Sequence, residues 1–181
     1  MLKAQLLQGN FKSETSLKQA QLDYETYIQL SFDHSFNYSL LSWNNIAVLR
    51  YYNNHLSDSL IAANTILQSS LQECGINLGS RSINSITEEE CHVYCSNPLN
   101  ATILFNTAFL YGESGQIQVA HDLWKKLYHE IPEYYDCELS CIKQLIKQQR
   151  YEQAKTDLQT LMDLLESHLK TEVSSICCID D

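Results

Sequence analysis

The stretch that decides the fold is residues 101–132, which read ATILFNTAFLYGESGQIQVAHDLWKKLYHEIP. Both halves repeat apolar residues at helical spacing, at Leu104, Ala108 and Tyr111 and then at Ala120, Trp124 and Leu127. Gly112 and Gly115 separate the halves, and Pro132, which cannot continue a helix, closes the second. Spacing near 3.6 residues predicts helices, and Gly115 permits a turn conformation that a β-carbon would resist. The stretch therefore predicts a helix, a tight turn and a second helix.

The same pattern returns 34 residues later. The equivalent pairs keep their size and polarity: Tyr111 with Leu145, Ile117 with Tyr151, Ala120 with Ala154, Trp124 with Leu158, and Leu127 with Leu161. A period of about 34 residues is the signature of the tetratricopeptide repeat (TPR). The two helices of such a repeat cross closely where a small residue lies, here Ala120 and Ala154. We expect Trp124 and Leu158 to pack over the first helix of the following repeat.

An earlier copy begins near Leu40. The sequence WNNIA starting at Trp43 is similar to the Trp-x-x-Leu-Gly consensus of the repeat, and Ser59 falls at the small position. The sequence therefore predicts another helical hairpin over 40–73.

The interval from Leu40 to Ala101 is 61 residues, which exceeds one period by 27. The excess lies in residues 74–100, which are rich in Ser, Asn and Gly and predict an inserted loop. Within it, TEEE at 87–90 fits a helix-starting capping box. The alternative is therefore a short helix near 87–95.

Together these patterns predict an all-α fold, an αα-hairpin solenoid of TPR units stacked as a right-handed superhelix. Only 5 Gly and 2 Pro occur, too few for the frequent turns of a sandwich or barrel. The predicted divisions are a degenerate N-terminal helical repeat at 1–39, a TPR at 40–73, the insertion at 74–100, TPRs at 101–134 and 135–168, and a flexible tail at 169–181.

Charge and composition exclude several classes of function. The chain carries 12 Lys and Arg against 22 Asp and Glu, a net charge of −10, so we expect no direct nucleic-acid binding. No run approaches the ~20 apolar residues that cross a bilayer, so we expect no membrane partner. Seven cysteines, an odd number, without a secretory leader predict thiols in a reducing compartment.

The sequence contains candidate ligands for a metal, but their spacing is unlike that of a structural zinc site. These candidates are Cys91, His92, Cys95, Cys137 and Cys141. Structural zinc usually takes close Cys pairs on tight turns, so we interpret the thiols as small apolar residues and expect no metal or cofactor. The chain also has no Gly-x-Ser-x-Gly, no His-Glu-x-x-His and no phosphate-binding Gly-rich loop, so we expect no catalytic residues. A metal-binding protein or an enzyme using these five residues is the rival hypothesis.

The first helices of TPR units line a concave groove, and certain positions of each helix point into it. Here the predicted groove residues are Asn44, Val48, Tyr51, Tyr52, Phe105, Phe109, Lys143 and Lys147. Two interpretations are equally open. The residues either anchor a partner peptide or helix, or they pack against neighbouring repeats. A clamp for chaperone carboxylates needs paired Lys and Asn residues. Only Lys143 and Asn44 are available, so we do not expect one.

The order of motifs resembles one group of TPR proteins more closely. The sequence WNNIAVLRYY at 43–52 is followed by a spacer, then by NTAFLYG at 106–112, AHDLWKKLYHEIP at 120–132 and Tyr135-Asp-Cys. This order is similar to the central repeats of the TPR scaffold subunit of the RNA polymerase II-associated-factor (PAF) complex. The resemblance covers roughly residues 40–165. It implies a nuclear, non-enzymatic scaffold within a larger complex for transcription elongation and histone modification. The alternative is a cytoplasmic TPR adaptor or co-chaperone.

Overall fold

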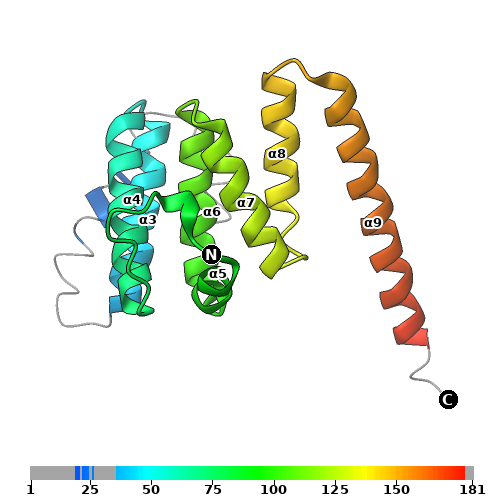
Figure 1. Ribbon diagram of the computed structural model, residues 1–181, viewed down its shortest axis with the longest axis horizontal. Helices are drawn as coiled ribbons and strands as arrows, with labels where there is room; N and C mark the ends of the chain where they lie inside the picture. The colour runs from blue at the N-terminus through cyan, green and yellow to red at the C-terminus, as the bar shows by residue number, and fades with distance from the viewer. Residues whose placement is uncertain (1–18, 21, 25, 27–35, 178–181) are drawn as a thin grey trace. The chain divides into compact units, whose positions relative to one another are not determined.

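The computed structural model describes residues 19, 20, 22–24, 26 and 36–177, and it shows helices throughout that part of the chain (Figure 1). The elements are α3 (Phe36–Tyr52), α4 (Leu56–Glu73), the 3-10 helix η1 (Ile83–Ser85), α5 (Glu88–Cys95), α6 (Pro98–Glu113), α7 (Ile117–Glu130), α8 (Asp136–Lys147) and α9 (Tyr151–Cys177). No strand occurs among these residues, so the all-α prediction is confirmed for them.

The chain divides into two compact units. The N-terminal unit ends at Pro132 and the C-terminal unit begins at Glu133. Each is described here by itself.

In the N-terminal unit, α3 and α4 form a helical hairpin. The turn between them places Asn54 at φ 64°, and His55 N donates a hydrogen bond to the Arg50 carbonyl (2.9 Å). Ser59 of α4 is fully buried, and its Oγ donates to the carbonyl oxygen of Ala47 in α3 (2.5 Å). A small side chain at Ser59 therefore lets the backbones of the two helices approach closely.

The helices α6 and α7 form the second hairpin of this unit. Gly115 lies in the turn at φ 85°, a left-handed conformation that favours glycine. Ala120 and Trp124 of α7 are both buried, and Trp124 packs at a tilt against Phe105 of α6 (6.4 Å between ring centroids). The tight turn and the small residue at 120 are the features expected from residues 101–132.

The insertion is part of the core rather than a projecting loop. Ile76, Leu78, Ile83 and Ile86 are all buried. The predicted short helix is present as α5, and its capping box is confirmed: Glu90 N donates to Thr87 Oγ1 (3.1 Å) and Thr87 N donates to Glu90 (2.9 Å). The expectation of a plain loop over 74–100 is therefore wrong, because this segment carries enough apolar residues to pack against the hairpins.

Tyr94 anchors the insertion to α4. Its ring is completely buried, and its hydroxyl lies 2.5 Å from Ser70 Oγ. Asn100 Nδ2 donates to the Tyr94 carbonyl (3.1 Å), which joins the end of α5 to the start of α6. On the other side, Lys126 Nζ of α7 donates to the carbonyl of Asn84 in η1 (2.5 Å). The insertion is therefore bonded to helices of both hairpins.

The C-terminal unit is the hairpin of α8 and α9. Its core consists of Ile142, Leu145, Ala154 and Leu161, with Tyr135 and Leu165 packed against it. Tyr135 Oη also lies 2.6 Å from His168 Nδ1.

The tail was predicted to begin at residue 169, but α9 continues to Cys177. Leu158, Met162, Leu165 and Leu169 keep helical spacing, and Leu169 lies just past His168. Because the apolar period does not stop at the predicted boundary, the helix does not stop there either. Residues 178–181 lie outside the described residues.

The predicted N-terminal repeat at 1–39 also lies largely outside the described residues. A hydrogen bond joins this segment to α3: Asn45 Nδ2 donates to Tyr24 Oη (3.2 Å). Burial raises the pKa of Tyr24.

Candidate interaction surface

An aromatic cluster joins α3 to α6. The ring of Tyr51 meets Phe109 edge-on, with ring centroids 5.2 Å apart and planes at 88°. Tyr51 also packs against Tyr52 at 5.2 Å and 64°. Edge-to-face pairs of this kind are favourable by about 1 kcal/mol beyond the area they bury. Tyr52 is exposed, while Tyr51 and Phe109 are half-buried. The cluster therefore presents an ordered aromatic edge to solvent.

Glu113 supplies a carboxylate beside this cluster. Tyr51 Oη donates a hydrogen bond to Glu113 Oε2 (2.9 Å). Burial, followed by that hydrogen bond, raises the pKa of Tyr51 to about 12. The phenol therefore stays protonated at neutral pH and continues to donate to the carboxylate. We call Tyr51, Tyr52, Phe109 and Glu113 the aromatic surface.

A second polar contact connects the same two helices. Asn106 Nδ2 of α6 donates to Asn44 Oδ1 of α3 (3.3 Å). Asn44 is 62 residues from Asn106, and Tyr51 is also 62 residues from Glu113. A constant difference in residue number, rather than a constant sum, means that α3 and α6 run parallel and in register.

Asn44 differs from its predicted role. It is only 3 % exposed, so the side chain lies in the α3–α6 contact and not on the open surface. Its Nδ2 atom has no hydrogen-bond partner among the described residues. The cause is local, because the hydrogen bond from Asn106 holds the Asn44 side chain between the two helices.

The other predicted groove residues divide between the two units. Val48 and Phe105 are half-buried, and Phe105 stacks against Trp124 within the N-terminal unit. Lys143 and Lys147 are exposed on α8. The structure therefore joins Tyr51, Tyr52 and Phe109, whereas the two lysines belong to the C-terminal unit.

Sequence reasoning did not predict two polar contacts of this surface. Glu113 falls at a groove-facing repeat position, but its hydrogen bond with Tyr51 was not expected, and Asn106 was not selected. A signal was present, because both residues lie 62 positions after a polar partner in α3, close to the 61-residue interval between the predicted repeat starts. Comparing polar residues at the repeat interval would have paired them.

The cysteines with described side chains lie in two separate pairs, on α5 and on α8, apart from Cys74. Cys91 Sγ lies 3.7 Å from Cys95 Sγ on α5, and both thiols are buried. The contact with Cys95 lowers the pKa of Cys91, whereas burial raises the pKa of Cys141 to about 12. Among the described residues, no three His, Cys, Asp or Glu side chains converge as metal ligands would. His92, the other residue of the rival hypothesis, points Nδ1 at Glu130 Oε2 (2.8 Å).

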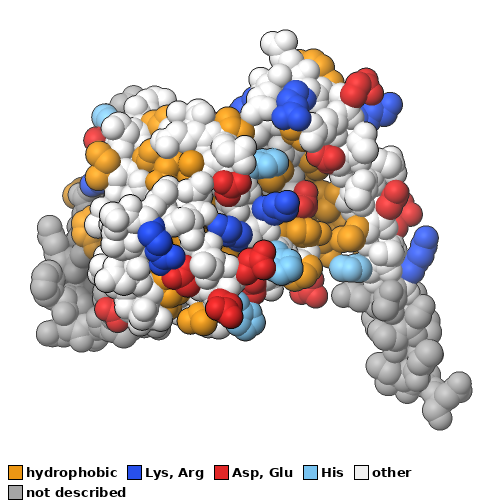
Figure 2. Space-filling view, viewed as in Figure 1, with side chains coloured by type: hydrophobic (Ala, Val, Ile, Leu, Met, Phe, Trp, Pro, Cys, Tyr) orange, Lys and Arg blue, Asp and Glu red, His pale blue; other side chains and the backbone are white. Residues whose placement is uncertain are grey.

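Charge and hydropathy of the described helices add two observations. Figure 2 shows acidic and basic side chains intermixed over the viewed face of the N-terminal unit. Among the described helices, none combines the length and the apolar character that a bilayer-crossing segment requires.

The N-terminal unit is therefore an assembly of helical hairpins, and two of its parallel helices, α3 and α6, carry the aromatic surface. No protein-family model matches the chain, and comparison with curated proteins and with solved structures finds no match to it either.

Proposed function

We propose that the chain is a TPR-type scaffold that binds a protein partner and catalyses no reaction. The single observation that carries the proposal is the register of α3 and α6, parallel at a constant offset of 62 residues. In a TPR array the first helices of successive hairpins are parallel neighbours and line the binding groove. Here α3 and α6 each begin a hairpin, and the aromatic surface lies where they meet.

The chemistry of the aromatic surface favours a partner segment that carries Arg or Lys beside an apolar residue. Aromatic faces attract cations, by about 0.5–2 kcal/mol per contact. The Glu113 carboxylate adds a charged hydrogen-bond acceptor, and the net charge of −10 attracts a basic segment at longer range. Apolar side chains of the partner would pack against Tyr52 and Phe109, because aromatic residues often anchor protein interfaces.

On the resemblance to the PAF-complex subunit, we propose that this scaffold acts in nuclear complexes for transcription elongation and histone modification. A cytoplasmic adaptor or co-chaperone remains the second candidate. The two share the aromatic surface and differ in the partner.

The experiment for the proposal selects ligands from a displayed library of short random peptides and measures their affinities by calorimetry. We expect the selected peptides to be enriched in Arg or Lys next to an apolar residue. Phe109→Ala should weaken their binding by about tenfold, which corresponds to about 1.4 kcal/mol. Glu113→Gln should weaken it less and should reduce its dependence on salt. Ile61→Ala is the matched control, because Ile61 is an exposed apolar residue of α4 in the same unit.

Circular dichroism of each variant separates binding from folding. Retained helix with lost binding in Phe109→Ala supports the proposal. Loss of helix in that variant, or equal affinities for Phe109→Ala and Ile61→Ala, contradicts it. Affinity capture from nuclear and cytosolic extracts, with the same two variants, then distinguishes the two candidate partners.

A further inference from the structure

An exposed apolar stripe runs along α9. It consists of Tyr151, Leu158, Met162 and Leu169, which are 60, 41, 48 and 61 % exposed. Spacings of 7, 4 and 7 residues return to the same side of a helix. The buried residues Ala154 and Leu161 lie further round the helix, where they pack in the core with residues of α8. The stripe therefore borders the core of the hairpin but is itself exposed, and we call it the α9 stripe.

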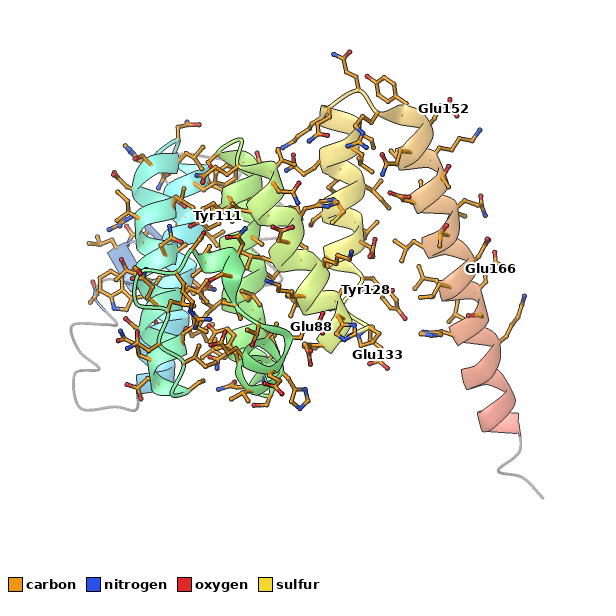
Figure 3. All side chains as sticks on the ribbon, viewed as in Figure 1. Glu88, Tyr111, Tyr128, Glu133, Glu152 and Glu166 are labelled. Carbon is orange, nitrogen blue, oxygen red and sulfur yellow. The ribbon has the colours of Figure 1, made fainter. Side chains whose placement is uncertain are left out.

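Four charged residues flank the α9 stripe along one edge. They are Glu152, Lys155, Glu166 and Lys170. At 100° per residue, Lys155 and Glu166 fall beside Met162, and Glu152 and Lys170 fall further round the same side. Figure 3 shows Glu152 and Glu166 on the side of α9 that faces away from α8. Glu166 and Lys170 approach to 3.9 Å within the helix.

The order of these residues is self-complementary when the helix is reversed. Tyr151 pairs with Leu169 and Leu158 pairs with Met162 about a midpoint at residue 160. Lys155 pairs with Glu166, and Glu152 pairs with Lys170, about midpoints between 160 and 161. One antiparallel register therefore places apolar residues on apolar residues and opposite charges on each other. A parallel two-fold pair would instead place the charged edges of the two copies on opposite sides of the contact, so the Lys155–Glu166 pair would not form.

We propose that the α9 stripe is a self-association surface, on which α9 of a second copy of this chain packs antiparallel. Two-fold symmetry makes the contact isologous, so each apolar and each charged pair occurs twice. The occupant is a second copy because the charges that flank the stripe complement their own reverse order. Lys155 and Glu166 lie about 16 Å apart along one helix, so they meet only between copies. A single-helix contact lies at the small end of specific interfaces, which implies a reversible dimer.

Sedimentation of the full chain over a range of concentrations tests the proposal. We expect a monomer–dimer equilibrium with a Kd on the order of 10 μM, weakened by salt. Met162→Glu places two like charges near the symmetry axis and should abolish the dimer. Lys155→Glu should raise the Kd by about tenfold. The double variant Lys155→Glu with Glu166→Lys restores the pair between copies and should bring the Kd back to within about twofold.

Lys125→Glu is the matched control, because Lys125 is an exposed lysine of α7 in the N-terminal unit. This change removes the same charge elsewhere and should leave the Kd unchanged. Circular dichroism verifies that every variant keeps its helix.

A chain that stays monomeric at every concentration overturns the proposal, since the stripe is then covered by another protein or by nothing. A dimer that survives Met162→Glu, or a double variant no better than the single one, also overturns it. None of these measurements depends on peptide binding to the aromatic surface, so the two proposals are tested independently.

Discussion

The hairpins α6–α7 and α8–α9 repeat the same sequence pattern at a distance of 34 residues, yet one pair of equivalent residues differs sharply in burial. Ala120 and Ala154 are equivalent, and both are buried. Trp124 and Leu158 are also equivalent, but Trp124 is 1 % exposed and Leu158 is 41 % exposed. The small residue is therefore buried by its own hairpin in both cases, whereas burial of the larger residue depends on what packs outside the hairpin. The expectation that Leu158 is covered like Trp124 is wrong for the described residues.

The largest effect in this comparison is expected at the small residue. Ala120→Trp forces an indole into a contact with no free space, and overpacking on this scale should unfold the N-terminal unit. Gln118→Trp, at an exposed position of the same helix, should leave the helix content unchanged. Circular dichroism of both variants checks this. A folded Ala120→Trp protein would mean that the two helices do not cross closely at residue 120.

The next effect separates the two equivalent large residues. Trp124→Ala should lower the free energy of unfolding by about 3–5 kcal/mol, because it removes a buried indole and leaves a cavity. Leu158→Ala removes a side chain that is already partly hydrated, so the loss should be under about 1 kcal/mol. Urea denaturation below the micromolar range, where we expect the monomer, measures both. Equal losses would show that Leu158 is covered in solution.

The smallest effect is expected at the ion pair between Arg81 and Glu90 within the insertion. Arg81 donates to both carboxylate oxygens of Glu90 (2.6 and 3.2 Å), and this holds the pKa of Glu90 at about 2, below its ordinary 4.5. Because the folded-state pKa is depressed, the pair contributes stability above about pH 4.5, and that stability is lost as the pH falls toward 2. Glu90→Gln should flatten this part of the pH profile in urea denaturation, and Glu89→Gln should not.

The sequence predicts the hairpins well because their signals are local. The 34-residue period identifies Ala120, Ala154 and the turn at Gly115, and the capping box predicts the start of α5. The packed insertion was not predicted, since Tyr94 and Ser70 are joined only by the tertiary fold. The burial of Asn44 was not predicted for the same reason. The position of a residue in the predicted repeat indicates which side of the helix it faces, but not how closely the next helix approaches.

The most direct test of the central account maps a selected basic peptide onto the protein by NMR chemical-shift perturbation. The account predicts that the largest shifts fall on Tyr51, Tyr52, Phe109 and Glu113. It also predicts that these shifts disappear in Phe109→Ala and persist in Ile61→Ala. Shifts concentrated elsewhere, with unchanged affinity in Phe109→Ala, would contradict the claim that α3 and α6 present the binding surface.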